Sequence, residues 1–78
     1  QNVKKKGDSM RQYLCELREE LGCTQLEISK KLNISESYYS LIENGERQKK
    51  FDMTMAKKLA DIFGVTREFI YDHEREVS

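Results

Sequence analysis

The sequence predicts an all-α domain of five short helices, and three observations lead to that prediction. Apolar residues recur every three or four positions in several separate windows, which is the spacing of one helical face. Residues that favour helix starts precede these windows, and glycine or asparagine follows most of them. The chain has 78 residues, of which 37% are hydrophobic and none is tryptophan, so it can form one small domain with a thin core.

The first helix is predicted from about Ser9 to Leu21. Its apolar stripe consists of Met10, Tyr13, Leu14, Leu17 and Leu21. Ser9 and Gln12 have the spacing of a capping box, and Gly22 can adopt the left-handed conformation that often ends a helix. Residues 1–8 lack an apolar pattern, so we expect a flexible arm there.

The second helix should begin after Thr24, whose hydroxyl can accept a hydrogen bond from a free amide of the first turn. Glu27, three residues later, completes a capping box. Ile28 and Leu32 lie one helical turn apart and indicate the buried face. Asn33 tolerates the left-handed conformation, so we expect the helix to end there.

The third helix should begin almost at once, with Ser35 as its N-cap. Two helices with so short a linker cross at a steep angle, which leaves the second projecting from the domain, where it can enter a major groove. Steps of about 100° per residue place Tyr39 and Ile42 toward the core. The opposite face is either a contact surface or merely solvated. It carries Ser37, Ser40, Leu41 and Asn44, with Glu36 and Tyr38 on its flanks.

Two more helices complete the prediction. Gly45 should end the third helix, and Asp52 should cap the fourth after a polar loop. Gly64 should close the fourth helix, and Thr66 should cap a fifth that fades near Glu74. The residues of the fourth helix expected to face inward are Met53, Ala56, Leu59, Ala60 and Phe63.

Three consecutive bulky residues, Phe69, Ile70 and Tyr71, cannot all face one small core from a single helix. One of them should be left over. It either forms an apolar surface for a second copy of the chain, together with Val65, or folds back over the first helix as a lid.

The charge balance argues against some classes of function. With 14 basic and 14 acidic residues the formal net charge is zero, which argues against an indiscriminate nucleic-acid binder and a polybasic membrane binder. Positive charge nevertheless gathers after the third helix, at Arg47, Lys49 and Lys50. Charge runs are usually only solvated, but this loop leaves directly from the projecting helix. We therefore expect contacts to a phosphate backbone.

Nothing in the sequence predicts catalysis, a cofactor or a metal. Cys15, Cys23 and the single histidine, His73, lack metal-ligand spacing. We expect both cysteines to be reduced thiols of a cytoplasmic protein, and His73 to be exposed on a fraying end. No catalytic constellation is assembled, so the chain is not predicted to be an enzyme. No apolar run is long enough to cross a bilayer, so no membrane partner is expected.

One stretch resembles a known family. The matching residues are TQ at 24–25, E and I at 27–28, KL at 31–32 and S..YYS.IENG at 35–45. These residues resemble the Cro/cI-type helix-turn-helix family, also called the XRE family, and the likeness extends from about Met10 to Tyr71. It implies a compact five-helix lambda-repressor-like domain at 9–75, with the helix-turn-helix motif at 24–45 and a tail at 76–78.

The resemblance assigns roles by position. In that family the residue matching Gln25 contacts phosphate and sometimes a base, those matching Glu36, Ser37 and Leu41 face bases, and those matching Asn44 and Arg47 hold phosphates. Together with the helical wheel, this gives expected base readers at Glu36, Ser37, Ser40 and Leu41. The expected backbone contacts are Gln25, Ser35, Tyr38, Asn44, Arg47, Lys49 and Lys50.

The resemblance also implies a partly buried structural ion pair between Arg18 and Glu43. The alternative is two independent surface charges, which would contribute almost nothing to stability. In the loop after Arg47 this chain is slightly longer than the family pattern. It carries Gln48, Lys49 and Lys50 where the family often has proline.

The function expected from these features is sequence-specific binding of double-stranded DNA. The resemblance implies a repressor of a prokaryote, phage or mobile element. Because one recognition helix with weak base readers covers only a few base pairs, we expect it to act as a homodimer on a palindromic operator. The alternative is a helical protein-interaction module, or an antitoxin, whose DNA binding is secondary to a regulatory protein partner. Zero net charge and the leftover aromatic near the C-terminus fit that alternative.

Overall fold

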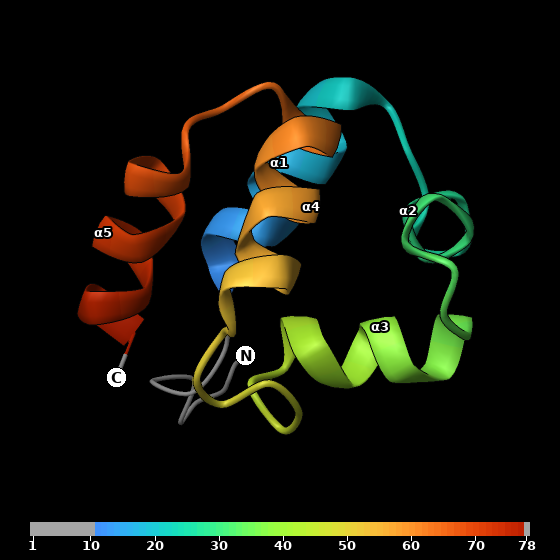
Figure 1. Cartoon of the computed structure of the whole chain (residues 1–78). Coiled ribbons are helices and arrows are strands. Elements are labelled where there is room, and N and C mark those ends of the chain that lie inside the picture. Colours follow the sequence, from blue (N-terminus) through green and yellow to red (C-terminus); the bar gives the residue numbers. More distant parts are fainter. Residues whose placement is uncertain (1–10, 78) are drawn as a thin grey trace, which may run out of the picture.

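The computed structural model describes residues 11–77, which form five α-helices. The helices are α1 (Gln12–Leu21), α2 (Gln25–Leu32), α3 (Glu36–Glu43), α4 (Met53–Phe63) and α5 (Arg67–Val77). Figure 1 shows α1 and α4 in the middle, α2 and α5 on opposite sides of them, and α3 across one end. α4 packs against α1, α2 and α5, and α3 packs against α1 and α2. The predicted all-α fold is confirmed.

The first helix begins later than predicted. Arg11 has a non-helical backbone, with φ −90° and ψ 75°, and its amide donates a 2.7 Å hydrogen bond to the carbonyl of Glu43. This bond fixes Arg11 against α3, so the helix begins at Gln12 and the predicted start at Ser9 is wrong. The cap expected at Ser9 and the arm expected at 1–8 lie outside the described residues.

The turn between α2 and α3 follows the predicted capping chemistry. Thr24 Oγ1 accepts from the amide of Glu27 at 3.1 Å, and Glu27 Oε1 accepts from the amide of Thr24 at 2.8 Å. Asn33 ends α2 with a left-handed φ of 63°, and Ser35 caps α3 by accepting from the amide of Tyr38 at 3.0 Å. In Figure 1 α2 is seen along its axis while α3 lies across the view. The predicted steep crossing is therefore present.

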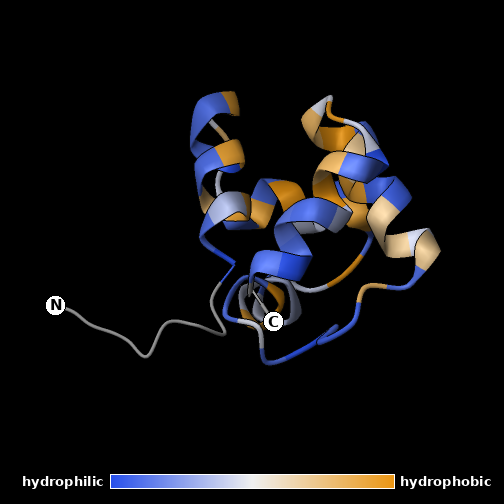
Figure 2. Cartoon of the chain, turned by 90° about the vertical axis from the view of Figure 1, so that its left-hand side faces the viewer, coloured by the Kyte–Doolittle hydropathy of each residue, from blue (hydrophilic) through white to orange (hydrophobic). Residues whose placement is uncertain are grey.

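The core takes fully buried side chains from all five helices. They are Leu14, Ile28, Tyr39, Ile42, Ala56, Leu59 and Ile70. Figure 2 shows hydrophobic and hydrophilic stretches alternating along the helices, as expected when one face of each helix is buried. The predicted inward phase of α3 is confirmed, because Tyr39 and Ile42 are both 0% exposed.

One residue of α4 departs from the prediction. Asp52 caps this helix by accepting from the amide of Met55 at 2.7 Å, and Gly64 ends it with a φ of 71°, as predicted. Met53, however, is 70% exposed, so its predicted place in the core is wrong. It shares a helical face with Ala56, but it is the first residue of α4, where the described residues leave its side chain exposed.

The last helix is longer than predicted. Thr66 Oγ1 accepts from the amide of Phe69 at 3.0 Å, which confirms the cap. α5 then continues to Val77 instead of fading near Glu74. Of the three bulky residues, Ile70 is fully buried, while Phe69 and Tyr71 flank it in half-buried positions.

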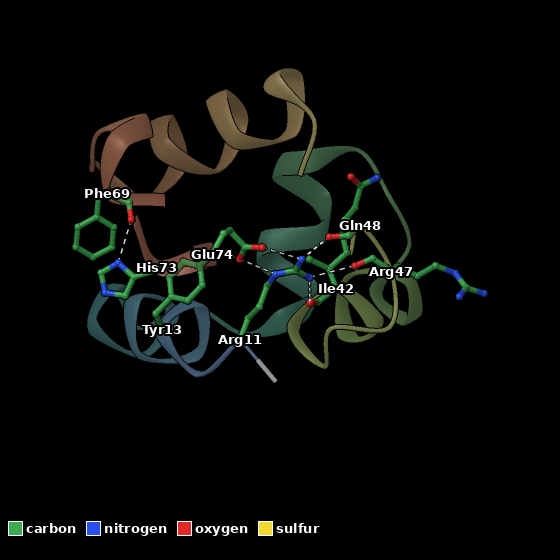
Figure 3. A network of polar contacts seen from close by, with 8 residues as sticks. All are labelled: Arg11, Tyr13, Ile42, Arg47, Gln48, Phe69, His73 and Glu74. Atoms are coloured by element: carbon green, nitrogen blue, oxygen red, sulfur yellow. Dashed lines mark hydrogen bonds and ion pairs between the residues drawn. The ribbon is translucent and has the colours of Figure 1, made fainter. Parts of the chain in front are cut away.

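His73 is not exposed, which corrects the prediction. Its ring stacks on Tyr13 with centroids 4.9 Å apart and lies 4.3 Å from the ring of Phe69. Nδ1 lies 2.9 Å from the carbonyl oxygen of Phe69, one turn earlier on α5 (Figure 3). The continuation of the helix past Glu74 holds His73 in this position.

Among the described residues, no helix is long and apolar enough to cross a membrane.

Candidate nucleic-acid interface

The outer face of α3 and the start of α2 together form a shallow hollow of about 410 Å³. It is lined by Gln25, Glu36, Ser37, Ser40 and Leu41. Glu36 and Ser37 are exposed, whereas Gln25, Ser40 and Leu41 are half-buried. The four residues expected to read bases therefore share one surface with the residue expected to open the motif.

The residues expected to contact a phosphate backbone lie at both ends of α3. Ser35 is exposed at the N-cap, and Asn44 is exposed at the C-cap. Tyr38 is half-buried, and its hydroxyl accepts from Gln48 Nε2 at 3.0 Å. This bond ties the middle of α3 to the loop that follows it.

The loop at 44–52 carries the positive charge. Arg47, Lys49 and Lys50 are all exposed. Figure 1 shows that this loop leaves the end of α3, and Figure 2 shows that it is hydrophilic along most of its length. Gln48 turns the chain here with a left-handed φ of 53°, an uncommon conformation for a residue other than glycine. The loop thus presents three exposed cations directly after α3.

A buried cluster around Glu43 fixes the orientation of α3. Arg18 Nε donates to Glu43 Oε2 at 2.8 Å, and Arg18 Nη2 donates to Oε1 at 3.3 Å. Gln25 Nε2 and Cys15 Sγ also donate to Oε1, at 2.9 and 3.1 Å. The side chain of Glu43 is 2% exposed and that of Arg18 is 17% exposed. α1, α2 and α3 therefore meet at a single carboxylate.

The ionisation of this cluster follows from its contacts. Burial disfavours the charged form of Glu43, but hydrogen bonds from Arg18, Gln25 and Cys15 outweigh it and hold the pKa of Glu43 below its ordinary value. Burial, reinforced by the neighbouring carboxylate, raises the pKa of the Cys15 thiol to about 11. Burial, together with the nearby carboxylate of Glu43, also raises the pKa of Tyr39. Glu43 is accordingly ionised at neutral pH, and Cys15 is a protonated thiol.

Arg11 is the residue of this region that the sequence did not reveal. It is 1% exposed and bonds to Glu74 on α5 and to main-chain carbonyls at the end of α3 and in the loop. Its spacing from Leu14 and Arg18 places it on the buried face of the first helix, which was the one available signal. Its partners are 31 to 63 residues away, so no local pattern indicated them.

The described residues contain no group of three or more His, Cys, Asp or Glu side chains that could hold a metal ion. Both cysteines are free, with Cys15 buried and Cys23 half-buried. The side chains on the outer face of α3 offer hydrogen bonding, apolar contact and charge, which are the interactions that proteins use on DNA grooves and phosphates.

Comparison with known proteins identifies the family. A family model described as helix-turn-helix matches residues 16–70. The chain belongs to the XRE-type helix-turn-helix regulators. It is 40% identical to the uncharacterized HTH-type transcriptional regulator YqaF of Bacillus subtilis (strain 168) over 55 residues, and this aligned segment makes up 70% of each chain. No solved structure matches.

Membership of this family gives the broad function. XRE-type helix-turn-helix regulators bind double-stranded DNA and regulate transcription, and proteins of this family are typically not enzymes. The matched segment contains the whole of α2 and α3 and the loop after them. The surface formed by these elements is therefore the part of the molecule on which DNA binding is to be sought.

Proposed function

We propose that this XRE-type regulator is a transcriptional repressor of a prokaryote, phage or mobile element that binds a palindromic operator as a symmetric dimer. The observation that carries the proposal is the shared surface of Gln25 with the outer face of α3, bordered by the cationic loop. A helix presented in this way fits the major groove, with its first turns toward the base edges. Such a protein acts in the cytoplasm, where its DNA is.

The base-reading residues have limited chemistry. Ser37 and Ser40 can donate to or accept from several bases, and Leu41 can contact a thymine methyl group. Glu36 can accept from the amino group of cytosine, while a phosphate repels it. Each contact therefore discriminates only modestly between bases. Glu36 contributes to specificity mainly by weakening binding to DNA sites that offer it no amino group.

The backbone contacts surround this face. Arg47, Lys49 and Lys50 approach the phosphates from the loop, and Asn44 from the end of α3. Ser35, Tyr38 and Gln25 are the remaining candidates, although the Gln25 amide donates to Glu43 in the free protein. This bond orients Gln25 and leaves its carbonyl oxygen and second amide hydrogen for DNA.

A dimer follows from the small size of the reading surface. One recognition helix covers only a few base pairs, so a second copy on an adjacent half-site is needed for useful specificity. Val65, in the turn before α5, and Phe69 and Tyr71 on α5 offer half-buried apolar surface. α5 lies on the opposite side of α1 and α4 from α2 (Figure 1). Ile70 drops out of the expected dimer surface, because it is 0% exposed and belongs to the core.

A second candidate function is binding of a regulatory protein, with DNA contact secondary. The feature that favours it is a hollow of about 370 Å³ between the loop and α5, lined by aromatic and charged side chains. These are Lys49, Lys50, Phe51, Tyr71, Glu74 and Arg75. This hollow would suit a peptide with acidic and apolar groups, as in an antitoxin that binds its toxin.

Titration of the pure protein with DNA from upstream of its own gene, and with a scrambled duplex, at two salt concentrations separates the two functions. The proposed repressor binds the upstream DNA at least about a thousandfold more tightly than the scrambled duplex, with a salt dependence set by its phosphate contacts. Equal, weak binding to both duplexes would favour the protein-interaction module.

A further inference from the structure

The guanidinium group of Arg11 lies under the loop between α3 and α4 and holds its backbone. Nη1 donates to the carbonyl of Ile42 at 2.7 Å and to that of Arg47 at 3.1 Å, and Nη2 donates to the carbonyl of Gln48. Nε and Nη2 donate to the two carboxylate oxygens of Glu74 at 2.7 and 2.9 Å. Figure 3 shows this network, in which one side chain joins α1, the end of α3, the loop and α5.

The network compensates a charge that would otherwise be costly to bury. The side chain of Arg11 is 2% exposed, and that of its counter-charge, Glu74, is 15% exposed. The guanidinium carbon also lies 4.1 Å from the centre of the Phe51 ring, a distance suited to a cation–π contact. A lysine could keep the charge, but its single ammonium group cannot donate to acceptors in so many directions.

The same contacts control where the loop side chains point. The carbonyls of Arg47 and Gln48 face inward toward Arg11, whereas Figure 3 shows the side chain of Arg47 extending away from the network. Gln48 has a left-handed backbone although it is not a glycine, and its bonds to Arg11 and Tyr38 hold this conformation. Release of the carbonyls would free the cationic loop.

We propose that Arg11, with Glu74 as its counter-charge, is a positioning residue for DNA binding that orders the loop before the phosphates arrive. The proposal rests on the proposed function, in which Arg47, Lys49 and Lys50 contact the backbone. Side chains that are already ordered lose less entropy on binding, so the same phosphate contacts give higher affinity. Arg11 itself is buried and touches no DNA.

The first test is Arg11→Lys, which keeps the charge and removes the multiple donors. At a temperature well below the melting transition, affinity for the operator and for a scrambled duplex should fall by the same factor, about tenfold. The salt dependence should stay close to that of the parent protein, because the same phosphate contacts form once the loop has become ordered on the DNA. Glu74→Gln should act in the same direction, and it tests the proposal should Arg11→Lys fail to fold.

The matched control is Ile70→Val, which leaves a small cavity in the core beside α5. It removes none of the hydrogen bonds that Arg11 makes to Glu74 and to the loop carbonyls. It lowers the melting temperature without changing the loop, so its DNA affinity and salt dependence should equal those of the parent protein. If Arg11→Lys and Glu74→Gln bind DNA as this control does, Arg11 has only a structural role and the proposal is wrong.

A loop variant separates this inference from the proposed function. The triple change Arg47→Ala, Lys49→Ala and Lys50→Ala should weaken binding, and Arg11→Lys added to it should cause no further loss. Full affinity in the triple variant would show that the loop does not contact the DNA phosphates, and this part of the proposed function would be wrong. Weak binding by the triple variant, with an undiminished further loss on adding Arg11→Lys, would overturn only the positioning role.

Discussion

Gln25 Nε2 donates a 2.9 Å hydrogen bond to Glu43 Oε1, and this bond joins the first residue of α2 to the last residue of α3. Gln25 also lines the hollow on the outer face of α3. The buried carboxylate that organises the three N-terminal helices therefore also orients a side chain on the proposed DNA surface. Glu43 therefore links the stability of the fold to the proposed DNA surface, which makes it the first residue to test.

Replacement of Glu43 by alanine should strongly destabilise the fold. It would leave Arg18 as a partly buried charge without its carboxylate and would remove the acceptor of Gln25 and Cys15. Loss of one partner of such a pair costs about 3 kcal/mol or more of unfolding free energy. Denaturant unfolding should measure this loss, and Arg18→Ala added to Glu43→Ala should cause little further loss. Additive losses would show that the two side chains are energetically independent.

Stability should also depend on pH in the acidic range. The pKa of Glu43 is lowered only in the folded protein, so the unfolded chain takes up a proton first as the pH falls. The contribution of Glu43 is therefore fully present above the ordinary pKa of glutamate and is lost as the pH drops through and below it. Urea unfolding between neutral and acidic pH measures this loss. In Glu43→Gln this part of the pH dependence should vanish, and an unchanged pH profile would contradict the assignment.

The capping predictions at Thr24, Ser35 and Asn33 succeeded because each depends on neighbours in the sequence. Thr24 with Glu27, and Ser35 with the amide of Tyr38, need only residues within one turn of each other. Asn33 likewise marks its own helix end by its tolerance of a positive φ. Capping interactions of this local kind can be predicted from the sequence without a structure.

The roles of Arg11 and His73 could not be predicted in the same way. Arg11 meets Glu74 across 63 residues, and His73 meets Tyr13 across a similar distance. Those contacts exist because the assembled fold brings α5 to Arg11 and Tyr13, and no local pattern in the sequence shows that. The exposure of Met53 has the same origin, since the helical phase alone does not say where the neighbouring helices end.

Sequence choice should depend on Ser37 and Leu41. The double change Ser37→Ala and Leu41→Ala should alter the preferred site in a selection from random duplexes. It should leave the melting temperature nearly unchanged, because neither side chain belongs to the core. Tyr39→Phe is a useful control, since it alters the buried face of the same helix and should keep the original site. A collapse of thermal stability in the double variant would contradict the assigned phase.

Dimer formation should depend on the apolar flank of α5. Tyr71→Asp places a charge on half-buried surface next to the loop hollow. It should abolish cooperative protection of a palindrome in footprinting, while binding to an isolated half-site persists. Sedimentation of the free protein and of Tyr71→Phe as a control completes the test. Should Tyr71→Asp protect the full palindrome as cooperatively as the parent, the dimer surface lies elsewhere.

The most direct test of the proposed DNA surface is the salt dependence of binding by Arg47→Ala. Arg47 is exposed in the loop after α3, and its side chain points away from the buried network (Figure 3). If it holds a phosphate, its removal should weaken binding to operator and scrambled DNA by about the same factor. It should also lower the slope of log K against log salt by about one unit. A loss confined to the operator, with an unchanged slope, would contradict the division between base-reading α3 and the phosphate-binding loop.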